Sequence, residues 1–353
     1  MKTKVFRITP QMTGGKEFAE ACRILQEGGL VAFPTETVYG LGGDALKEDV
    51  AAKIYEAKGR PSDNPLIVHI ADTQALWELA ASVPDKACKL AEKFWPGPLT
   101  MILPKSELVP MGTTGGLSTV AVRMPEHPLA LELIRKSGVY VAAPSANTSG
   151  RPSPTRAEHV IEDLSGKIDC ILDGGAVGIG LESTIIDLTS DTPMILRPGA
   201  VTKSMLEAVV GEVEYDPAVI SREMKKDVVA KAPGMKYRHY APQGEMIIVE
   251  GEPDKVVAYI NEQIADRLKK NPQGKIAVIA SVETGGFYNN AIVRTVGSRE
   301  DEKSVAAGLY DVLRQMDSLH AEYIYAESFC SEELGQAIMN RMRKAAGYHI
   351  VNV

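Results

Sequence analysis

Cysteine is scarce in this sequence. Its four cysteines are spread over 353 residues, and no two of them form a C-x-x-C pair. Disulfide scaffolds and structural zinc sites both need cysteines in close groups, so this spacing argues against either. We expect reduced thiols that lie in the core.

Long apolar runs are also missing. No segment approaches the roughly 18 consecutive apolar residues that suggest a membrane-spanning helix. The first residues do not form the apolar region of a secretory signal either. The sequence therefore predicts a cytoplasmic protein with no role at a membrane.

An excess of positive charge is absent as well. The formal net charge is −7, and neither half of the chain holds more Lys and Arg than Asp and Glu. Because binding to nucleic-acid phosphates depends on Lys and Arg, we expect direct RNA binding, including tRNA, to be weak or absent. A local basic groove is still compatible with these totals.

Several familiar catalytic motifs do not occur: there is no P-loop, no H-E-x-x-H, no G-x-S-x-G and no protein-kinase signature set. The series Gly40-x-Gly42-x-x-Ala45 loosely fits a dinucleotide-binding fingerprint. That fingerprint leaves a strand and opens a helix directly, whereas here residues 34–39 separate it from the apolar run before it. We therefore do not expect a dinucleotide site.

What the sequence does contain is a regular alternation of apolar strands and amphipathic helices. We predict strands near 4–9, 29–33, 66–70, 99–103, 119–124, 139–143, 184–188 and 194–197. We predict helices near 16–27, 48–58, 72–81, 85–94, 127–137, 156–163 and 202–210. This pattern predicts an α/β domain with a twisted mixed sheet and flanking helices.

A chain of this length is too long for one ordinary core, so we expect two domains. Predicted strands at 245–250, 275–281, 292–296 and 323–326 alternate with helices near 253–269, 301–317 and 331–346, which indicates a small Rossmann-like α/β unit. We therefore divide the chain into a catalytic domain (1–210), a linker or lid (211–243) and a small C-terminal domain (244–353).

Two polar segments near the start of the first domain are candidates for a site. In residues 31–44 an apolar run ends at Pro34 and gives way to Thr, Glu and closely spaced glycines, which let backbone approach a ligand. A tight turn that binds nothing is the alternative.

In residues 54–65, Gly59 and Pro61 end a helix so that Lys58 and Arg60 can converge on one polyphosphate. Cations at a helix C-terminus also stabilise the helix dipole, which is the plainer explanation.

Three further features follow predicted strands. Residues 139–153 lead from an apolar strand into small neutral donors that suit a nucleotide, although an ordinary capped turn has the same composition. Residues 173–187 combine glycines with a Glu-Ser-Thr series and continue to Arg197. His69 ends a predicted strand, where a histidine is more often a satisfied, half-buried side chain than a ligand.

The predicted linker ends in a cluster of basic and aromatic residues between two prolines, Pro233 and Pro242. One interpretation is a linker docked on a domain surface. The other is a lid that contributes ligand contacts.

Together, these segments resemble the YrdC-like family. The resemblance lies in P-T-E-T-V-Y-G-L at 34–41, K-x-R and N-P-L within 58–66, P-S-A-N at 144–147, E-S-T at 182–184 and L-R-P-G at 196–199. The series Y-R-H-Y-A-P at 237–242 is similar to the linker of the longer, two-domain L-threonylcarbamoyladenylate synthases. Beyond residue 245 the resemblance is one of layout alone.

The resemblance implies a nucleotidyltransferase that converts L-threonine, bicarbonate and ATP into threonylcarbamoyl-AMP and pyrophosphate. It implies Mg²⁺ that accompanies ATP. It also implies a separate, downstream transferase complex that uses the product to modify the adenosine beside the tRNA anticodon. An acidic protein suits this role, because the product is a small molecule.

The resemblance also implies a set of site residues. For catalysis these are Lys58, Arg60, Ser145 and Asn147. Around ATP they are Arg60, Asn64, Thr119, Ser145, Ser153, Arg197, His239 and Tyr240. Around L-threonine they are Thr37, His69, Arg123, the backbone of Ala143, and Ser183. Metal ligands are not assigned, and a lid carrying His239 and Tyr240 would keep water from the labile carbamate and acyl-adenylate.

Two alternatives stay open. One is a non-catalytic protein that holds structured RNA on the same concave fold, which predicts an affinity that falls steeply with salt. The other is carbamoyl-adenylate chemistry on an acceptor other than threonine, which predicts that carbamoyl phosphate replaces threonine as a substrate.

Overall fold

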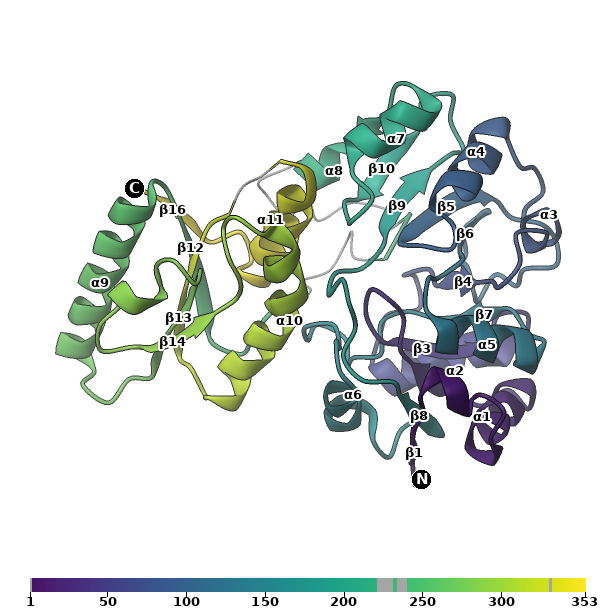
Figure 1. The fold of residues 1–353 in the computed structure, drawn as a ribbon, viewed down its shortest axis with the longest axis horizontal. Coiled ribbons are helices and arrows are strands. Elements are labelled where there is room, and N and C mark those ends of the chain that lie inside the picture. Colours follow the sequence, from purple (N-terminus) through teal and green to yellow (C-terminus); the bar gives the residue numbers. More distant parts are fainter. Residues whose placement is uncertain (1, 221–230, 234–239, 330–331) are drawn as a thin grey trace. The chain divides into compact units, whose positions relative to one another are not determined.

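The computed structural model describes residues 2–220, 231–233, 240–329 and 332–353 (Figure 1). The chain forms two compact units, the first made mainly of residues 1–149 and 153–221 and the second mainly of residues 237–353. Among the described residues, no helix is long and apolar enough to cross a membrane.

The first unit is built on a mixed sheet whose eleven described strands run in the order β1-β8-β2-β3-β7-β4-β6-β5-β9-β10-β11. The strands are β1 (Lys4–Arg7), β2 (Val31–Phe33), β3 (Gly40–Asp44), β4 (Ile67–His69), β5 (Leu99–Pro104), β6 (Thr119–Arg123), β7 (Val141–Ala142), β8 (Cys170–Asp173), β9 (Thr184–Asp187), β10 (Met194–Arg197) and β11 (Glu214–Tyr215). The helices are η1 (Pro10–Met12), α1 (Lys16–Gln26), α2 (Glu48–Lys58), α3 (Ala75–Leu79), α4 (Asp85–Phe94), α5 (Pro128–Ser137), α6 (Ala157–Leu164), α7 (Lys203–Val210) and α8 (Pro217–Ile220). This architecture confirms the predicted mixed sheet with flanking helices.

Alternation along the strands divides the apolar side chains of the sheet between two cores. In β2, Val31 and Phe33 pack with residues of α1 and α5, whereas Ala32 belongs to the larger core that α2, α4 and α6 share. In β7, Val141 and Ala142 divide in the same way. Helices therefore cover both faces at this end of the sheet.

The glycines of residues 40–43 lie in β3, which pairs antiparallel with β2 and β7, and so do not form the tight turn of the alternative interpretation. A Cβ atom on Gly43 would lie 2.3 Å from Cγ1 of Val50 in α2, and one on Gly42 would lie 2.7 Å from Cγ1 of Val141. These glycines are therefore needed for close packing inside the protein.

A third, smaller apolar cluster lies on the face of the sheet that turns away from the larger core, over β4, β6, β5, β9 and β10. We call it the open-face cluster; it consists of Ile67, Ile102, Ala121, Ile185, Leu196 and Ala232. Ala232 comes from the short described segment 231–233, so part of the predicted linker packs on this face. The polar residues discussed below share it.

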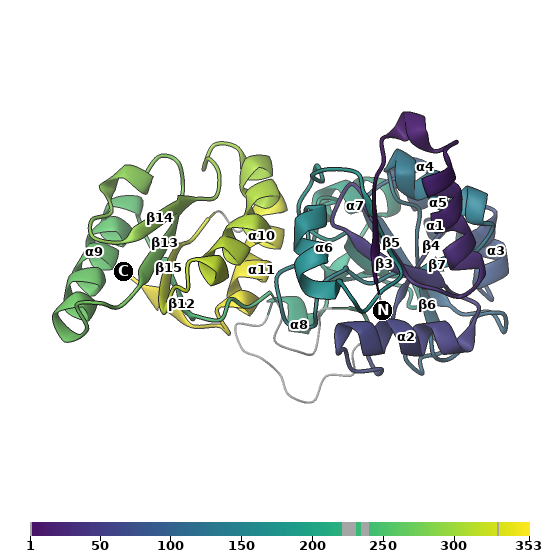
Figure 2. The same cartoon turned by 90° about the horizontal axis from the view of Figure 1, so that it is seen from below.

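The second unit is a parallel α/β sheet with the strand order β14-β13-β15-β12-β16. The strands are β12 (Glu245–Glu250), β13 (Ile276–Ala280), β14 (Ile292–Thr295), β15 (Tyr323–Glu327) and β16 (Ile350–Asn352). The helices are α9 (Pro253–Lys270), η2 (Gly285–Phe287), α10 (Glu302–Ser318) and α11 (Glu333–Ala345). Because crossovers are right-handed, the change of direction after β14 puts α9 on one face and α10 with α11 on the other, as Figures 1 and 2 show.

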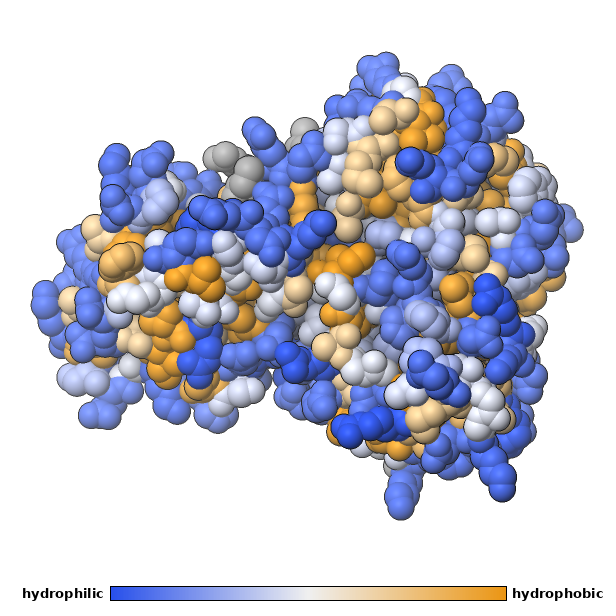
Figure 3. Space-filling model, viewed as in Figure 1, coloured by the Kyte–Doolittle hydropathy of each residue, from blue (hydrophilic) through white to orange (hydrophobic). Residues whose placement is uncertain are grey.

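Figure 3 shows hydrophobic residues gathered where α4 and α7 meet on the surface of the first unit. A groove there is lined by Phe94, Met205 and Val209 together with charged residues of α4. None of the predicted site residues lines this groove.

Candidate active site

Three polar side chains form a row across adjacent strands of the first unit. The strand register pairs His69 of β4 with Arg123 of β6, and Arg123 with Thr100 of β5. Alternation places all three on the face of the open-face cluster. Their exposed fractions are 4%, 4% and 0%, so the row is buried.

Arg123 forms a buried ion pair with Glu36, which follows β2. Its Nη2 atom donates to Oε1 of Glu36 at 2.6 Å, and its Nε atom donates to the carbonyl of Gly97 at 3.4 Å. The loop that carries Glu36 is itself anchored, because the carbonyls of Glu36 and Thr37 accept hydrogen bonds from Ile179 and Gly180. Thr37 is fully buried, and its hydroxyl is hydrogen-bonded to that of Thr35 at 2.8 Å.

His69 is neutral at physiological pH. Burial is the largest cause and the neighbouring guanidinium of Arg123 the second; against smaller opposing effects of the carbonyls of Ile67 and Val141, they lower the pKa of His69 to about 3. Its Nδ1 atom lies 3.1 Å from the carbonyl oxygen of Ile67, and since that oxygen accepts, Nδ1 carries the proton. Arg123 and Glu36 are thus the charged members of this group.

A hydrogen-bond network extends the row to β9 and β10. The hydroxyls of Thr100 and Ser183 are 2.7 Å apart, and Arg197 donates to both the hydroxyl and the carbonyl of Ser183 at 3.0 Å. Nη1 of Arg197 also lies 3.5 Å from the carbonyl of Pro233. The structure therefore joins one residue predicted for threonine, Ser183, to one predicted for ATP, Arg197.

Lys58 ends α2 and reaches the loop after β7. Gly59 closes the helix in the left-handed conformation, with φ of 59°. The buried ammonium of Lys58 donates to the carbonyls of Ser145 and Asn147 and to Oδ1 of Asn147, while the Ser145 hydroxyl donates to the same Oδ1 at 2.5 Å. Three of the four predicted catalytic residues are thus in direct contact.

Arg60, the fourth, turns back toward its own loop. Its Nη2 atom donates to the carbonyls of Asn64 and Pro65. Asn64 is 2% exposed, and its Oδ1 atom has no protein partner among the described residues. Thr119 begins β6 and lies on the same face as Arg123, about 13 Å away along the strand by the usual rise per residue.

Two other predicted residues, Ala143 and Ser153, are each placed by one hydrogen bond. The amide of Ala143 donates to the carbonyl of Ile67 at 2.8 Å, so the chain after β7 runs beside β4. Ser153 is fully buried, and its hydroxyl donates to Oε1 of Glu182 at 2.5 Å. This contact ties the loop after β7 to the residue before Ser183.

The two predicted linker residues are not placed at this site. His239 lies outside the described residues. Tyr240 belongs to the second unit, where its ring packs against that of Tyr310 with 5.2 Å between centroids. Their proposed contacts with ATP stay predictions.

Sequence reasoning missed two members of the site. No sequence pattern marks Thr100 as a site residue, because it lies inside an apolar strand. Only the strand register, which pairs it with Arg123, places it at the site. Glu36 stands in the P-T-E-T series and was an available signal, since a carboxylate directly after a buried strand is unusual. No group of three or more His, Cys, Asp or Glu within the described part of the chain is arranged to hold a metal ion.

Two family models match the sequence. The model described as "Telomere recombination" matches residues 23–199, and the model described as "Threonylcarbamoyl-AMP synthase, C-terminal domain" matches residues 201–347. Together they cover both units.

Curated proteins and solved structures agree with these matches. The threonylcarbamoyl-AMP synthase of Pyrococcus abyssi is 53% identical over 334 residues, which are 94% of this chain and 95% of that protein. The threonylcarbamoyl-AMP synthase of Bacillus subtilis is 48% identical over 357 residues, 99% of this chain and 100% of its own. The crystal structure of Pyrococcus abyssi Sua5 complexed with L-threonine has a TM-score of 0.90 and 50% identity, and the match covers 100% of this chain and 99% of that one.

Proposed function

Because this chain belongs to the threonylcarbamoyl-AMP synthase family, we propose that it joins L-threonine, bicarbonate and ATP into threonylcarbamoyl-AMP, with release of pyrophosphate and water. The observation that carries this proposal is the buried row of His69, Arg123 and Thr100 with its extension to Ser183 and Arg197. The row joins residues suited to an amino acid with residues suited to a nucleotide.

Arg123 receives the carboxylate of L-threonine. A guanidinium fork matches a carboxylate, and burial strengthens the pairing because little water competes. His69 stays neutral beside it, so it neither competes for the carboxylate nor repels the amino group. Thr37, Ser183 and the backbone at Ala143 complete the amino-acid site.

The chemistry proceeds in two stages. The threonine nitrogen first forms a carbamate with the carbon of bicarbonate, which releases water and one proton. A carbamate oxygen then attacks the α-phosphorus of ATP in line, and the bond to the leaving pyrophosphate breaks. Positioning and charge neutralisation are the main catalytic needs of such a transfer.

The contacts of Lys58 support a specific division of roles among the catalytic residues. Lys58 holds the Ser145–Asn147 loop through its three oxygen partners, and the loop presents Ser145 and Asn147 to the nucleotide. Arg60 neutralises phosphate charge together with Asn64, Ser153 and Arg197. Mg²⁺ enters bound to the ATP phosphates as part of the substrate, because this cation is commonly held by substrate phosphates.

The segment 231–233 supports a lid over this face. Ala232 packs in the open-face cluster, and Lys231 lies 3.8 Å from Asp187. A covering segment protects both the carbamate and the acyl-adenylate from water. We further propose that the product passes to a separate transferase complex that acts on tRNA, and that the enzyme works in the cytoplasm.

Pyrophosphate release tests the proposal. Release from Mg²⁺–ATP is measured in buffer purged of carbon dioxide, with L-threonine and bicarbonate each omitted in turn, and the nucleotide product is identified by mass spectrometry. We expect release only when both are present, with the mass of threonylcarbamoyl-AMP. Release with threonine alone would indicate an aminoacyl-adenylate instead, and no release under any combination would reject a synthase.

A matched pair of variants sharpens this test. Arg123→Gln is expected to abolish threonine-dependent release, because the carboxylate loses its buried cation. Arg7→Gln removes the same charge at the surface, where the Arg7 side chain is 86% exposed, and should leave release unchanged.

A further inference from the structure

The ion pair between Glu36 and Arg123 leaves one atom unused on each partner. Arg123 bonds through Nη2 and Nε, and its Nη1 atom makes no hydrogen bond to the described residues. Glu36 bonds through Oε1, and its Oε2 atom is buried without a protein partner in the described part of the chain. The side chains of Arg123 and Glu36 are 5% and 11% exposed.

An unpartnered carboxylate oxygen in a buried position is costly to the folded protein. The loop that carries Glu36 is fixed by backbone bonds to residues 179 and 180, so the side chain is held at this place by its surroundings. Packing alone would be served equally well by an apolar residue, without the penalty. The arrangement therefore indicates a ligand group that completes the pair.

The neighbouring titratable groups define the charge of that ligand. The charges of the pair act on two histidines, Arg123 on His69 and Glu36 on His127. Burial lowers the pKa of both, and the carboxylate of Glu36 raises the pKa of His127 by a smaller amount. His127 precedes α5, and its Nδ1 atom is likewise buried without a partner among the described residues. With both imidazoles neutral, Glu36 and Arg123 form a pair with no net charge.

A neutral pair with one open donor and one open acceptor matches a zwitterion. In an α-amino acid the carboxylate accepts and the ammonium donates, and one carbon atom separates the two groups. The terminal torsion of a Glu side chain is soft, so Oε2 can turn toward such a ligand without leaving its rotamer.

We propose that Glu36 is the ammonium-binding residue of the amino-acid site. The carboxylate of L-threonine accepts a hydrogen bond from Nη1 of Arg123, and the ammonium of L-threonine donates one to Oε2 of Glu36. This inference rests on the proposed function, because it assigns a further residue to the same site.

The contact also serves the reaction. The ammonium and bicarbonate form the carbamate, one water molecule and one proton, so the nitrogen exchanges its N–H bonds for a bond to carbon but keeps one N–H. That remaining N–H donates to the same carboxylate oxygen. Glu36 therefore holds the nitrogen in place before and after carbamate formation, while the carbamate oxygens point away toward the nucleotide.

Isothermal titration calorimetry with two ligands tests this assignment. The ligands are L-threonine and its analogue 2,3-dihydroxybutyrate, in which a hydroxyl replaces the amino group, in buffer free of bicarbonate and carbon dioxide. We expect the wild-type protein to prefer L-threonine by about tenfold or more, as for a charge-assisted hydrogen bond. In Glu36→Gln the preference should fall to about twofold or less, because an amide oxygen lacks the charge.

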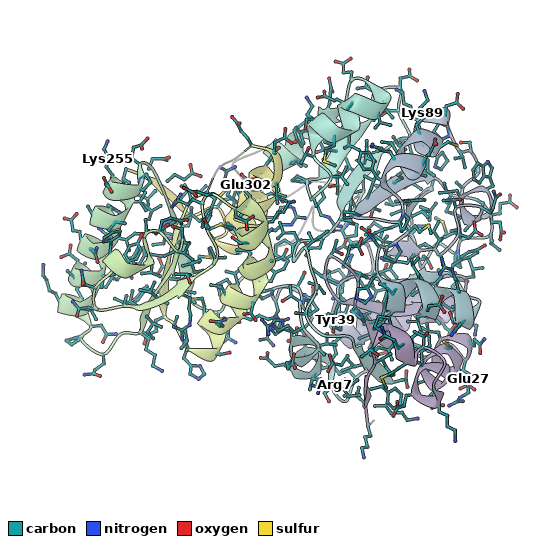
Figure 4. All side chains as sticks on the ribbon, viewed as in Figure 1. Arg7, Glu27, Tyr39, Lys89, Lys255 and Glu302 are labelled. Carbon is teal, nitrogen blue, oxygen red and sulfur yellow. The ribbon has the colours of Figure 1, made fainter. Side chains whose placement is uncertain are left out.

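A second variant guards against misfolding, since Glu36→Gln leaves the buried Arg123 unpaired. Glu36→Asp keeps the charge but withdraws the oxygens by one methylene, and should lose most of the preference. Glu27→Gln is the matched control, because Glu27 forms an exposed pair with Arg23 and lies at the outer edge of the first unit (Figure 4). It should bind both ligands like the wild type.

The outcomes separate this inference from the proposed function. If the wild type prefers L-threonine and folded Glu36 variants keep that preference, Glu36 has no contact with the amino group and the inference fails alone. If the wild type binds neither ligand, with ATP present or absent, the proposed function fails and this inference with it.

Discussion

At the scale of single residues, the neutral state of His69 links stability to function. In the proposed function, a second cation next to Arg123 would compete for the carboxylate of L-threonine or repel its ammonium, so an uncharged imidazole suits the site. Burial supplies this, since it disfavours the charged form and lowers the pKa of His69 to about 3. The same shift makes the protein sensitive to acid.

The free energy of unfolding should therefore decrease as the pH is lowered through a defined range. The folded pKa of about 3 lies below the ordinary value of 6.5, so the unfolded chain binds the proton more tightly. The contribution of neutral His69 is complete above pH 6.5 and is lost as the pH falls toward 3. At pH 5 the loss is about 2 kcal/mol.

Urea unfolding of wild type and His69→Gln at pH 7.5, 6, 5 and 4.5 measures this contribution. Other groups titrate equally in both proteins, so the difference between the two free energies isolates His69. We expect the wild type to lose more stability than the variant as the pH falls. A difference that is independent of pH would show that His69 is protonated alike in the folded and unfolded states.

At the scale of elements, β3 depends on residues without side chains. Val50 of α2 occupies the space that a Cβ on Gly43 would need, and Val50 is fully buried. The helix therefore packs directly on the backbone of the strand. Because α2 also carries Lys58 at its end, this contact also helps to fix the position of Lys58 and of the Ser145–Asn147 loop that Lys58 contacts.

Gly43→Ala should destabilise the protein by about 1–3 kcal/mol through overpacking. Adding Val50→Ala should restore part of this loss, so the double variant should be more stable than the sum of the single effects predicts. Gly14→Ala is the control, because no atom lies within 4 Å of its would-be Cβ, and it should change stability by less than about 0.5 kcal/mol. Strict additivity in urea unfolding would refute a direct clash between the two side chains.

The elements also show what the sequence can and cannot reveal. Strands with strong apolar patterns, such as β2, β5 and β6, were predicted close to their observed bounds. β3 was not predicted, because glycines give no apolar–polar alternation. The reason for these glycines is their close packing against other elements, including α2, which the sequence pattern does not show. β8 was not predicted either, since its four residues gain their place in the sheet from pairing with β1 and β2.

The candidate site was predictable as segments but not as contacts. The resemblance named Lys58 and the Ser145–Asn147 loop separately, and the structure joins them across 87 residues of sequence. Arg123 was predicted without its partner Glu36, also 87 residues away. Tertiary contacts between distant segments fix such pairs, and periodicity within a single segment carries no information about those contacts.

At the scale of the whole molecule, the segment 231–233 decides where the first unit ends. Each unit has its own apolar core. The match to the first family model ends at residue 199, and the match to the second begins at residue 201. Ala232 nevertheless packs in the open-face cluster of the first unit, and Pro233 accepts a hydrogen bond from Arg197. The first unit therefore extends past α8 and includes part of the predicted linker.

A fragment of residues 1–236 should thus be more stable than one of residues 1–220. Burial of Ala232 and the bond to Pro233 together contribute about 1–2 kcal/mol. Urea unfolding followed by circular dichroism compares the two fragments, and Ala232→Gln in the longer fragment should remove most of the gain, because a large polar side chain does not fit the cluster. The Lys231 side chain is 54% exposed, so Lys231→Gln, which weakens its pair with Asp187, should change little. Equal midpoints for the two fragments would mean that the segment does not dock on the isolated unit, and a lid over the row of His69, Arg123 and Thr100 would then need another anchor.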